Sequence, residues 1–276
     1  GHLVRGLRRL AIEKGVRIFE HTAMTELKRG RPPAVVTPRG TVTADKVVLG
    51  IYGWSLQVPE LRPAIMVICT DAVMTQPMPE RIAASGWRDY PGLTDSRIFV
   101  EAQRTTADGR VMWTKAGGRL PFGARLDAAL VTPHKSVAQM RALLREVYPD
   151  LADAPIAGTW SGPIDRSRTG LPLFGRLPTC PDILYGYGYS GAGIVLSRLG
   201  SKILASLALD TDDAWSSGPL VRAPDRAYPP EPIRWVGGHM VHAAIARKDR
   251  LDHEGRKTGP VTDLLLKFKP PSYKPT

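Results

Sequence analysis

The chain has 276 residues, 43% of them hydrophobic, and no apolar run is long enough to span a membrane. Its two cysteines, Cys69 and Cys180, lie far apart and outside any CxxC spacing, which excludes a disulfide scaffold or a zinc site and favours a reducing, cytoplasmic compartment. The net charge of +12 suits an anionic ligand, but the basic residues are spread along the chain without a nucleic-acid-binding motif, so we expect no specific nucleic-acid recognition.

Residues 1–55 predict part of a doubly wound domain. Apolar residues at helical spacing predict an N-terminal amphipathic helix: Leu3, Leu7, Leu10 and Ala11. Strand patterns follow at residues 16–22, 34–37, 41–43 and 47–50. A helix followed by short strands is typical of the second half of a nucleotide-binding domain, so we expect this domain to be incomplete, with an N-terminal segment missing.

Residues 56–160 predict an antiparallel sheet. A long strand is expected at 64–77, and a hairpin at 96–115 turns at Asp108 and Gly109. The apolar pattern from Ser136 predicts a helix that ends before Pro149. Long neighbouring strands without helices between them are typical of antiparallel sheets, so we expect a separate α+β domain here.

The last part of the chain changes character at about residue 210. Residues 156–177 are rich in turn-forming residues, and 182–188 predict a strand that returns to the first domain, assigned to residues 161–210. The next helix carries an apolar stripe: Ile194, Val195, Leu199, Ile203, Leu204 and Leu207. Residues 211–276 predict a proline-rich strap and a basic amphipathic helix at about 239–252.

A G-x-G-x-x-G string, at Gly186, Gly188 and Gly191, suggests a dinucleotide fingerprint. A true NAD fingerprint needs a second parallel strand ending in an acidic residue, but prolines recur after Asp213 and disfavour one there. An NAD-dependent dehydrogenase is therefore the weaker alternative. Strand, glycine turn and helix still aim backbone N–H groups and a helix N-terminus at a ligand.

Two other patterns suggest chemistry less strongly. His239 and His242 share a helix face, but no third ligand accompanies them, so we expect exposed histidines and no metal site. Ser190 stands in a sequence like a nucleophile elbow, although Ala192 replaces the last glycine and no acid–histidine pair follows in a suitable context. Hydrolase chemistry is therefore disfavoured.

The segments "WSGPIDRSRTGLPLFGRL" and "YGYGYSGAGIVLSRLGSKILASL" resemble the C-terminal flavin-contacting region of the D-amino acid oxidase (DAO) family of FAD-dependent oxidoreductases. The opening segment and "TADKVVLGIYGWS" resemble its middle FAD segments. Within the family the chain looks most like members described as aminophosphonate or gamma-glutamylputrescine oxidoreductases. The resemblance implies oxidation of a small-molecule amine or amino acid, acidic or aminophosphonate-like, by hydride transfer to flavin N5, giving an imine.

The resemblance also implies which residues bind FAD. They lie in three segments: Met24, then Gly50, Tyr52, Gly53 and Trp54, then Gly188, Tyr189, Ser190, Gly191, Ala192, Gly193 and Ile194. The family's N-terminal fingerprint for the pyrophosphate is absent from this sequence. Neither cysteine matches the position that holds covalent flavin in some members, so non-covalent FAD is expected.

Catalytic residues are not assigned, because hydride transfer to a flavin needs orientation more than acid–base chemistry. The substrate candidates are Arg104 and Trp113 in the hairpin, and Arg168 and Tyr189 near the glycine string. The alternative from a different functional class is a non-catalytic remnant that binds a partner through its basic tail.

Overall fold

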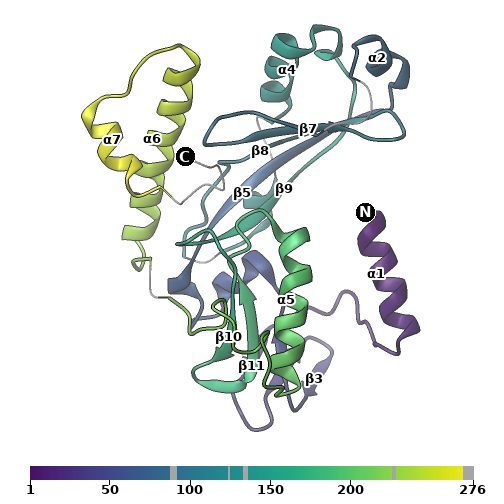
Figure 1. Ribbon diagram of the computed structural model, residues 1–276, viewed down its shortest axis with the longest axis vertical. Coiled ribbons are helices and arrows are strands. Elements are labelled where there is room, and N and C mark those ends of the chain that lie inside the picture. The colour runs from purple at the N-terminus through teal and green to yellow at the C-terminus, as the bar shows by residue number, and fades with distance from the viewer. Residues whose placement is uncertain (88–91, 124, 133–135, 226–227, 270–276) are drawn as a thin grey trace.

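The computed structural model describes residues 1–87, 92–123, 125–132, 136–225 and 228–269, and it contains three sheets (Figure 1). Two of them have three strands each. One is antiparallel, in the order β1 (Glu26–Lys28), β2 (Ala34–Thr37) and β3 (Gly40–Thr43). In the other, β11 (Cys180–Tyr187) lies between antiparallel β10 (Leu173–Leu177) and parallel β4 (Val47–Leu49). The mixed architecture confirms the expected fold class.

The third sheet has five antiparallel strands in the order β6-β7-β8-β5-β9. Its strands are β5 (Ile65–Thr75), β6 (Gly92–Thr94), β7 (Glu101–Thr105), β8 (Val111–Lys115) and β9 (Ile156–Ser167). The long strand and the β7–β8 hairpin are as expected. Short helical segments join the strands: η1 (Tyr52–Gln57), η2 (Arg62–Ala64), α2 (Pro79–Ala84), α3 (Ala128–Val131) and η3 (Pro149–Leu151).

Strand β9 corrects the prediction of a turn-rich loop in this part of the chain. It pairs with β5 from Ile65↔Ser167 to Thr75↔Ile156. Pro163 lacks an N–H group, but β9 is an edge strand, where proline removes no hydrogen bond from a further neighbour. Strand β9 continues across residue 160, where the sequence predicts a domain boundary. The division into domains stays a prediction.

The two faces of the five-stranded sheet differ in what covers them. On one face, Val73 and Trp113 pack with Met140 and Leu144 of α4 (Ser136–Val147), which lies over the sheet in Figure 1. Alternation along the strands turns Arg104 to the opposite face, which we call the open face.

Helix α5 (Gly193–Ala208) packs on β10 and β11, as Figure 1 shows. Ile203 and Leu207 are buried against Phe174, but Ile194 and Val195 are 78% and 76% exposed. The predicted apolar stripe is therefore exposed at its first two positions and packs against the sheet at its later ones.

In the described residues 214–225 and 228–232, the chain forms turns and bends, and Val221 makes a one-residue bridge to Phe174. This segment is not the strand that an NAD fingerprint requires. Helix α6 (Ile233–His253) is longer than predicted and pairs with α7 (Pro260–Leu266) (Figure 1). Within the described ranges no helix is long and apolar enough to cross a membrane.

The N-terminal helix forms as predicted, as α1 (His2–Glu13), but none of its side chains is buried. The predicted strand at residues 16–22 is wrong. Val16, Ile18 and Phe19 are exposed, and no strand of the described chain lies alongside to accept their backbone hydrogen bonds.

Gly200 allows α5 to approach β10. A Cβ atom there would lie 2.6 Å from Phe174 Cε1, so Gly200→Ala is expected to lower the free energy of unfolding by about 1–3 kcal/mol. Gly237→Ala in α6 is the matched control, because its Cβ meets nothing within 4 Å, and it should be neutral or raise stability by up to about 1 kcal/mol. Denaturant unfolding of both variants tests this, and equal effects would contradict it.

Candidate cofactor site

Two of the predicted cofactor segments meet at one edge of a sheet. Strands β4 and β11 are parallel, with Tyr185 opposite Leu49, so Gly50–Trp54 and Gly188–Gly193 both follow carboxyl ends at the same edge. A Cβ atom on Gly193 would lie 3.6 Å from the Tyr52 ring, and the Tyr52 and Tyr189 ring centroids are 5.9 Å apart. Ligands of open α/β sheets bind at this edge.

The backbone at this edge adopts the left-handed region at several residues. Gly188 and Gly191 have φ of 79° and 101°, and Ser190 and Tyr52, which carry side chains, have φ of 53° and 50°. A residue other than glycine in the left-handed region costs conformational free energy, and such residues are concentrated at functional sites. We call residues Gly188–Gly193 the glycine turn.

Asp165 of β9 holds the glycine turn in place. Its Oδ2 accepts a hydrogen bond from the Gly188 N–H at 2.6 Å, and its Oδ1 accepts one from Tyr189 at 3.1 Å. The main-chain oxygen of Asp165 accepts a third from the Ser190 N–H at 2.9 Å. Three consecutive N–H groups are therefore bound by one residue of the neighbouring sheet.

Burial raises the pKa of the fully enclosed Asp165 carboxyl group to about 7, and the backbone hydrogen bonds limit the rise. Asp165 is not among the site residues predicted from the sequence. The available signal was one acidic residue in a segment otherwise rich in Gly, Pro, Ser and Arg, just before the glycine string.

A different set of N–H groups in the turn has no internal acceptor. Among the described residues, the N–H groups of Gly191, Gly193 and Ile194 have no acceptor. The Ala192 N–H between them donates to the Tyr189 carbonyl, and the helical hydrogen bonds of α5 begin with the Leu196 N–H. They lie at the N-terminus of a 16-residue helix, where the helix dipole favours negative charge.

The other predicted cofactor residues occupy varied surroundings. A Cβ on Gly53 would lie 2.9 Å from Pro163 of β9, so this glycine permits close packing of η1 on that strand. Trp54 is exposed and Gly50 has open space beside it. Met24 packs against the core cluster beneath β4 and is not in the glycine turn.

The structure separates the four substrate candidates. Trp113 is fully buried and its Nε1 donates to Glu101, so it belongs to the core under α4. The Tyr189 ring packs between Tyr52 and Phe174, inside the protein. Both rings bury apolar surface in this way, as aromatic side chains commonly do, and a substrate role for either residue stays a prediction.

Arg104 lies on the open face but far from the glycine turn. Arg104 pairs with Met112, which pairs with Met74, and Met74 pairs with Gly158 on β9. Gly158 is six residues from Ile164 along this strand, which is roughly 20 Å at the usual rise per residue. By contrast, Ile164 lies beside the turn, with its Cδ1 4.0 Å from a Cβ placed on Gly191.

Arginines gather at the near end of the open face. Arg168 is exposed directly after β9, and the Tyr228 hydroxyl donates to the main-chain oxygen of Arg166 at 3.4 Å. Burial raises the pKa of Tyr228 to about 12, while the nearby positive charges of Arg166, Arg234 and Arg168 act to lower that pKa. We call these three arginines around Tyr228 the arginine cluster.

The two helix histidines do not behave alike. His239 is exposed, as expected, but His242 is half-buried, donates from Nε2 to the Gly117 carbonyl at 2.6 Å and packs against Phe99. Its role is to fix α6 against the sheet. Within the described residues, no group of three or more potential ligands could hold a metal ion.

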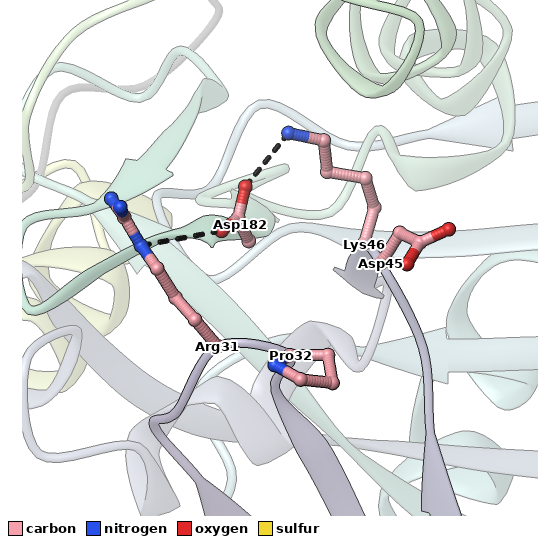
Figure 2. Close-up of a pocket in the computed structure, with 5 residues that line it drawn as sticks. All are labelled: Arg31, Pro32, Asp45, Lys46 and Asp182. Carbon is pink, nitrogen blue, oxygen red and sulfur yellow. Dashed lines mark hydrogen bonds and ion pairs between the residues drawn. The ribbon is translucent and has the colours of Figure 1, made fainter.

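A hollow of about 500 Å³ lies at the opposite end of β11 (Figure 2). Asp182 stands between Arg31 and Lys46 there, and Lys46 also pairs with Asp210 after α5. The Lys46 hydrogen bond lowers the pKa of Asp182. These charges pair with one another and tie β4, β11 and α5 together, so we assign the hollow a structural role.

Comparison with known proteins identifies the family. The family model described as "FAD dependent oxidoreductase" (DAO) matches residues 1–207. The chain belongs to the DAO family. It is similar to a probable oxidoreductase OrdL of Rhizobium meliloti, 31% identical over 75% of this chain and 46% of that protein. It is also similar to the gamma-glutamylputrescine oxidoreductase of Escherichia coli, 29% identical over 70% and 43%.

The chain spans about half the length of the curated relatives that it matches. Among solved structures, glycine oxidase from Bacillus cereus superposes with a TM-score of 0.62 at 18% identity, covering 80% of this chain and 58% of that one. Iminodiacetate oxidase from Chelativorans gives a TM-score of 0.60 at 19% identity, covering 81% and 58%. These likenesses show that the DAO chain has the fold of such oxidases.

The raised pKa of Asp165 predicts a pH-dependent stability. Between about pH 4 and 7 the unfolded chain has released this proton while the folded chain keeps it, so the free energy of unfolding falls as pH rises, by roughly 1 kcal/mol per unit, and levels off above pH 7. Asp165→Asn should lack this slope. Denaturant unfolding of both proteins from pH 4 to 8 measures the two free energies of unfolding. A native chain whose free energy of unfolding rises with pH relative to that of Asp165→Asn would contradict the prediction.

Proposed function

We propose that this chain contributes to FAD-dependent oxidation of a small-molecule amine or amino acid to an imine. The observation that carries the proposal is the set of N–H groups of Gly191, Gly193 and Ile194, which have no acceptor in the described part of the chain and lie at the carboxyl ends of β4 and β11. Bound FAD would take up a hydride from the carbon next to the substrate nitrogen. The imine then reacts with water to give a carbonyl compound and ammonia or an amine.

The chain's own residues hold and polarise the cofactor in this proposal. The glycine turn, Ile194 and Gly50–Trp54 would hold FAD, and the free N–H groups would stabilise negative charge that develops on it. Both cysteines are buried, and burial raises the pKa of Cys69 to about 11, which disfavours its reactive thiolate. These observations support non-covalent binding.

The arginine cluster supports a substrate with an acidic group, such as a carboxylate or phosphonate. The cluster lies at the end of the open face nearest the glycine turn, and Gly238 of α6 closes this end against Met66, with 3.7 Å between a Cβ on Gly238 and the Met66 Cε. Guanidinium groups bind planar or tetrahedral oxyanions through paired hydrogen bonds.

Loss of one free N–H group tests the cofactor site. Ile194→Pro removes the N–H in the first turn of α5, where it serves no helical hydrogen bond, and should weaken FAD binding by about tenfold with little change in stability. Ile194→Ala keeps the N–H and loses only an exposed side chain, so its affinity should match the native chain. FAD binding is measured by quenching of flavin fluorescence.

Equal FAD affinities for the two Ile194 variants would contradict the proposed role of the turn. A folded native chain that binds no flavin and oxidises no amine would instead support the alternative, a non-catalytic module of this family.

Substitution of Arg168 tests the proposed substrate class. Arg168→Ala should raise KM for an amine bearing a carboxylate or phosphonate by about tenfold and leave kcat nearly unchanged. The reason is that the lost contact stabilises the bound substrate and the transition state equally. Arg104→Ala is the control, since Arg104 is exposed on the same face but distant from the turn. Steady-state oxidation of acidic and neutral amines in the presence of FAD measures both. An unchanged KM in Arg168→Ala would contradict the assignment.

A further inference from the structure

We propose that Asp165 is a proton-controlled positioning residue: its carboxylate form fixes the glycine turn for ligand binding, and its protonation releases part of the turn. The identity of the ligand, the flavin of FAD, rests on the proposed function. The control of the turn rests on the geometry of this chain.

Each carboxylate oxygen of Asp165 is used by a different N–H group. Oδ2 binds Gly188 at 2.6 Å and Oδ1 binds Tyr189 at 3.1 Å, while the main chain of the same residue binds Ser190. The free N–H groups of Gly191, Gly193 and Ile194 follow directly along the chain. Their directions are therefore fixed relative to β9 by this one side chain.

Protonation cannot preserve both side-chain bonds at full strength. The proton must occupy one oxygen, and a hydroxyl oxygen accepts a hydrogen bond less well than a carboxylate oxygen. The longer bond, from Tyr189 to Oδ1, is the one expected to weaken.

The surroundings of Asp165 bring its titration into the neutral range. The titratable groups that face it are the hydroxyls of Tyr187 and Tyr189, whose pKa values burial raises to about 12, so neither titrates near neutrality. Asp225 and Arg222 act on Tyr187 from the strap. Arg166 follows Asp165 in β9 and points to the opposite face of the sheet. Burial without an ion pair then raises the pKa of Asp165 to about 7.

This arrangement couples the turn to the charge of its ligand. Negative charge that develops on a reduced flavin would repel the carboxylate, so Asp165 would bind a proton from solvent more tightly in that state. Oxidised FAD, whose ring is neutral, should bind best to the carboxylate form. Its affinity for the chain is therefore expected to rise with pH through about 7.

Amide NMR of the full chain tests the titration without any cofactor. In ¹⁵N-glycine-labelled protein, the Gly188 amide resonance should shift with a midpoint near pH 7, and Asp165→Asn should abolish this shift. The Gly109 amide, in the β7–β8 turn beside Asp108, is the internal control and should stay constant, because hydrogen bonds lower the pKa of Asp108. A Gly188 resonance that does not titrate between pH 5 and 9 would overturn the proposal.

FAD affinity measured by fluorescence from pH 6 to 8 tests the functional consequence. The native chain should bind about tenfold more tightly at pH 8 than at pH 6, Asp165→Glu should keep a pH dependence, and Asp165→Asn should bind weakly at every pH. A pH-independent affinity shared by native and Asn proteins overturns the proposal. Absence of FAD binding at any pH removes the proposed function, and the Gly188 titration alone then decides whether Asp165 controls the turn.

Discussion

The carboxylate of Asp165 joins the two sheets on which the candidate site depends. It belongs to β9, at the edge of the five-stranded sheet, and it accepts hydrogen bonds from the backbone that leaves β11 of the parallel pair. A buried carboxylate without these bonds would be costly, and a turn with several left-handed residues would be poorly determined without them. Each feature therefore explains how the other persists.

The same interaction divides the N–H groups of the turn by role. Gly188, Tyr189 and Ser190 donate to Asp165 and support the structure, whereas Gly191, Gly193 and Ile194 remain available to a ligand. A helix N-terminus offers such groups in general, but here their orientation is set by a strand of another sheet. This makes the site a product of tertiary structure more than of the glycine string alone.

Local patterns predicted most elements, and failures arose where tertiary contacts decide. The β7–β8 hairpin and α4 follow from turn residues and apolar spacing. Strand β9 was missed because Pro163 is tolerated only at an edge, and edges cannot be read from sequence. The faces of Arg104 and Trp113 depend on register, which separates neighbours in one hairpin. Asp165 could not be paired with Gly188, because the two residues are 23 positions apart in the sequence, which leaves the contact undetermined.

The glycines of the G-x-G-x-x-G string have separate physical reasons. A Cβ on Gly186 would lie 2.9 Å from the Phe174 ring, so this glycine serves packing beneath α5. Gly188 combines a left-handed backbone with a 2.8 Å approach to the Ser167 Cβ, and Gly191 needs the conformation while facing Ile164 at 4.0 Å. Gly186 is therefore needed for packing, Gly191 for the backbone conformation of the turn, and Gly188 for both. Packing and backbone conformation alone can therefore account for the three glycines, which is why the string indicates a nucleotide only when its strand context agrees.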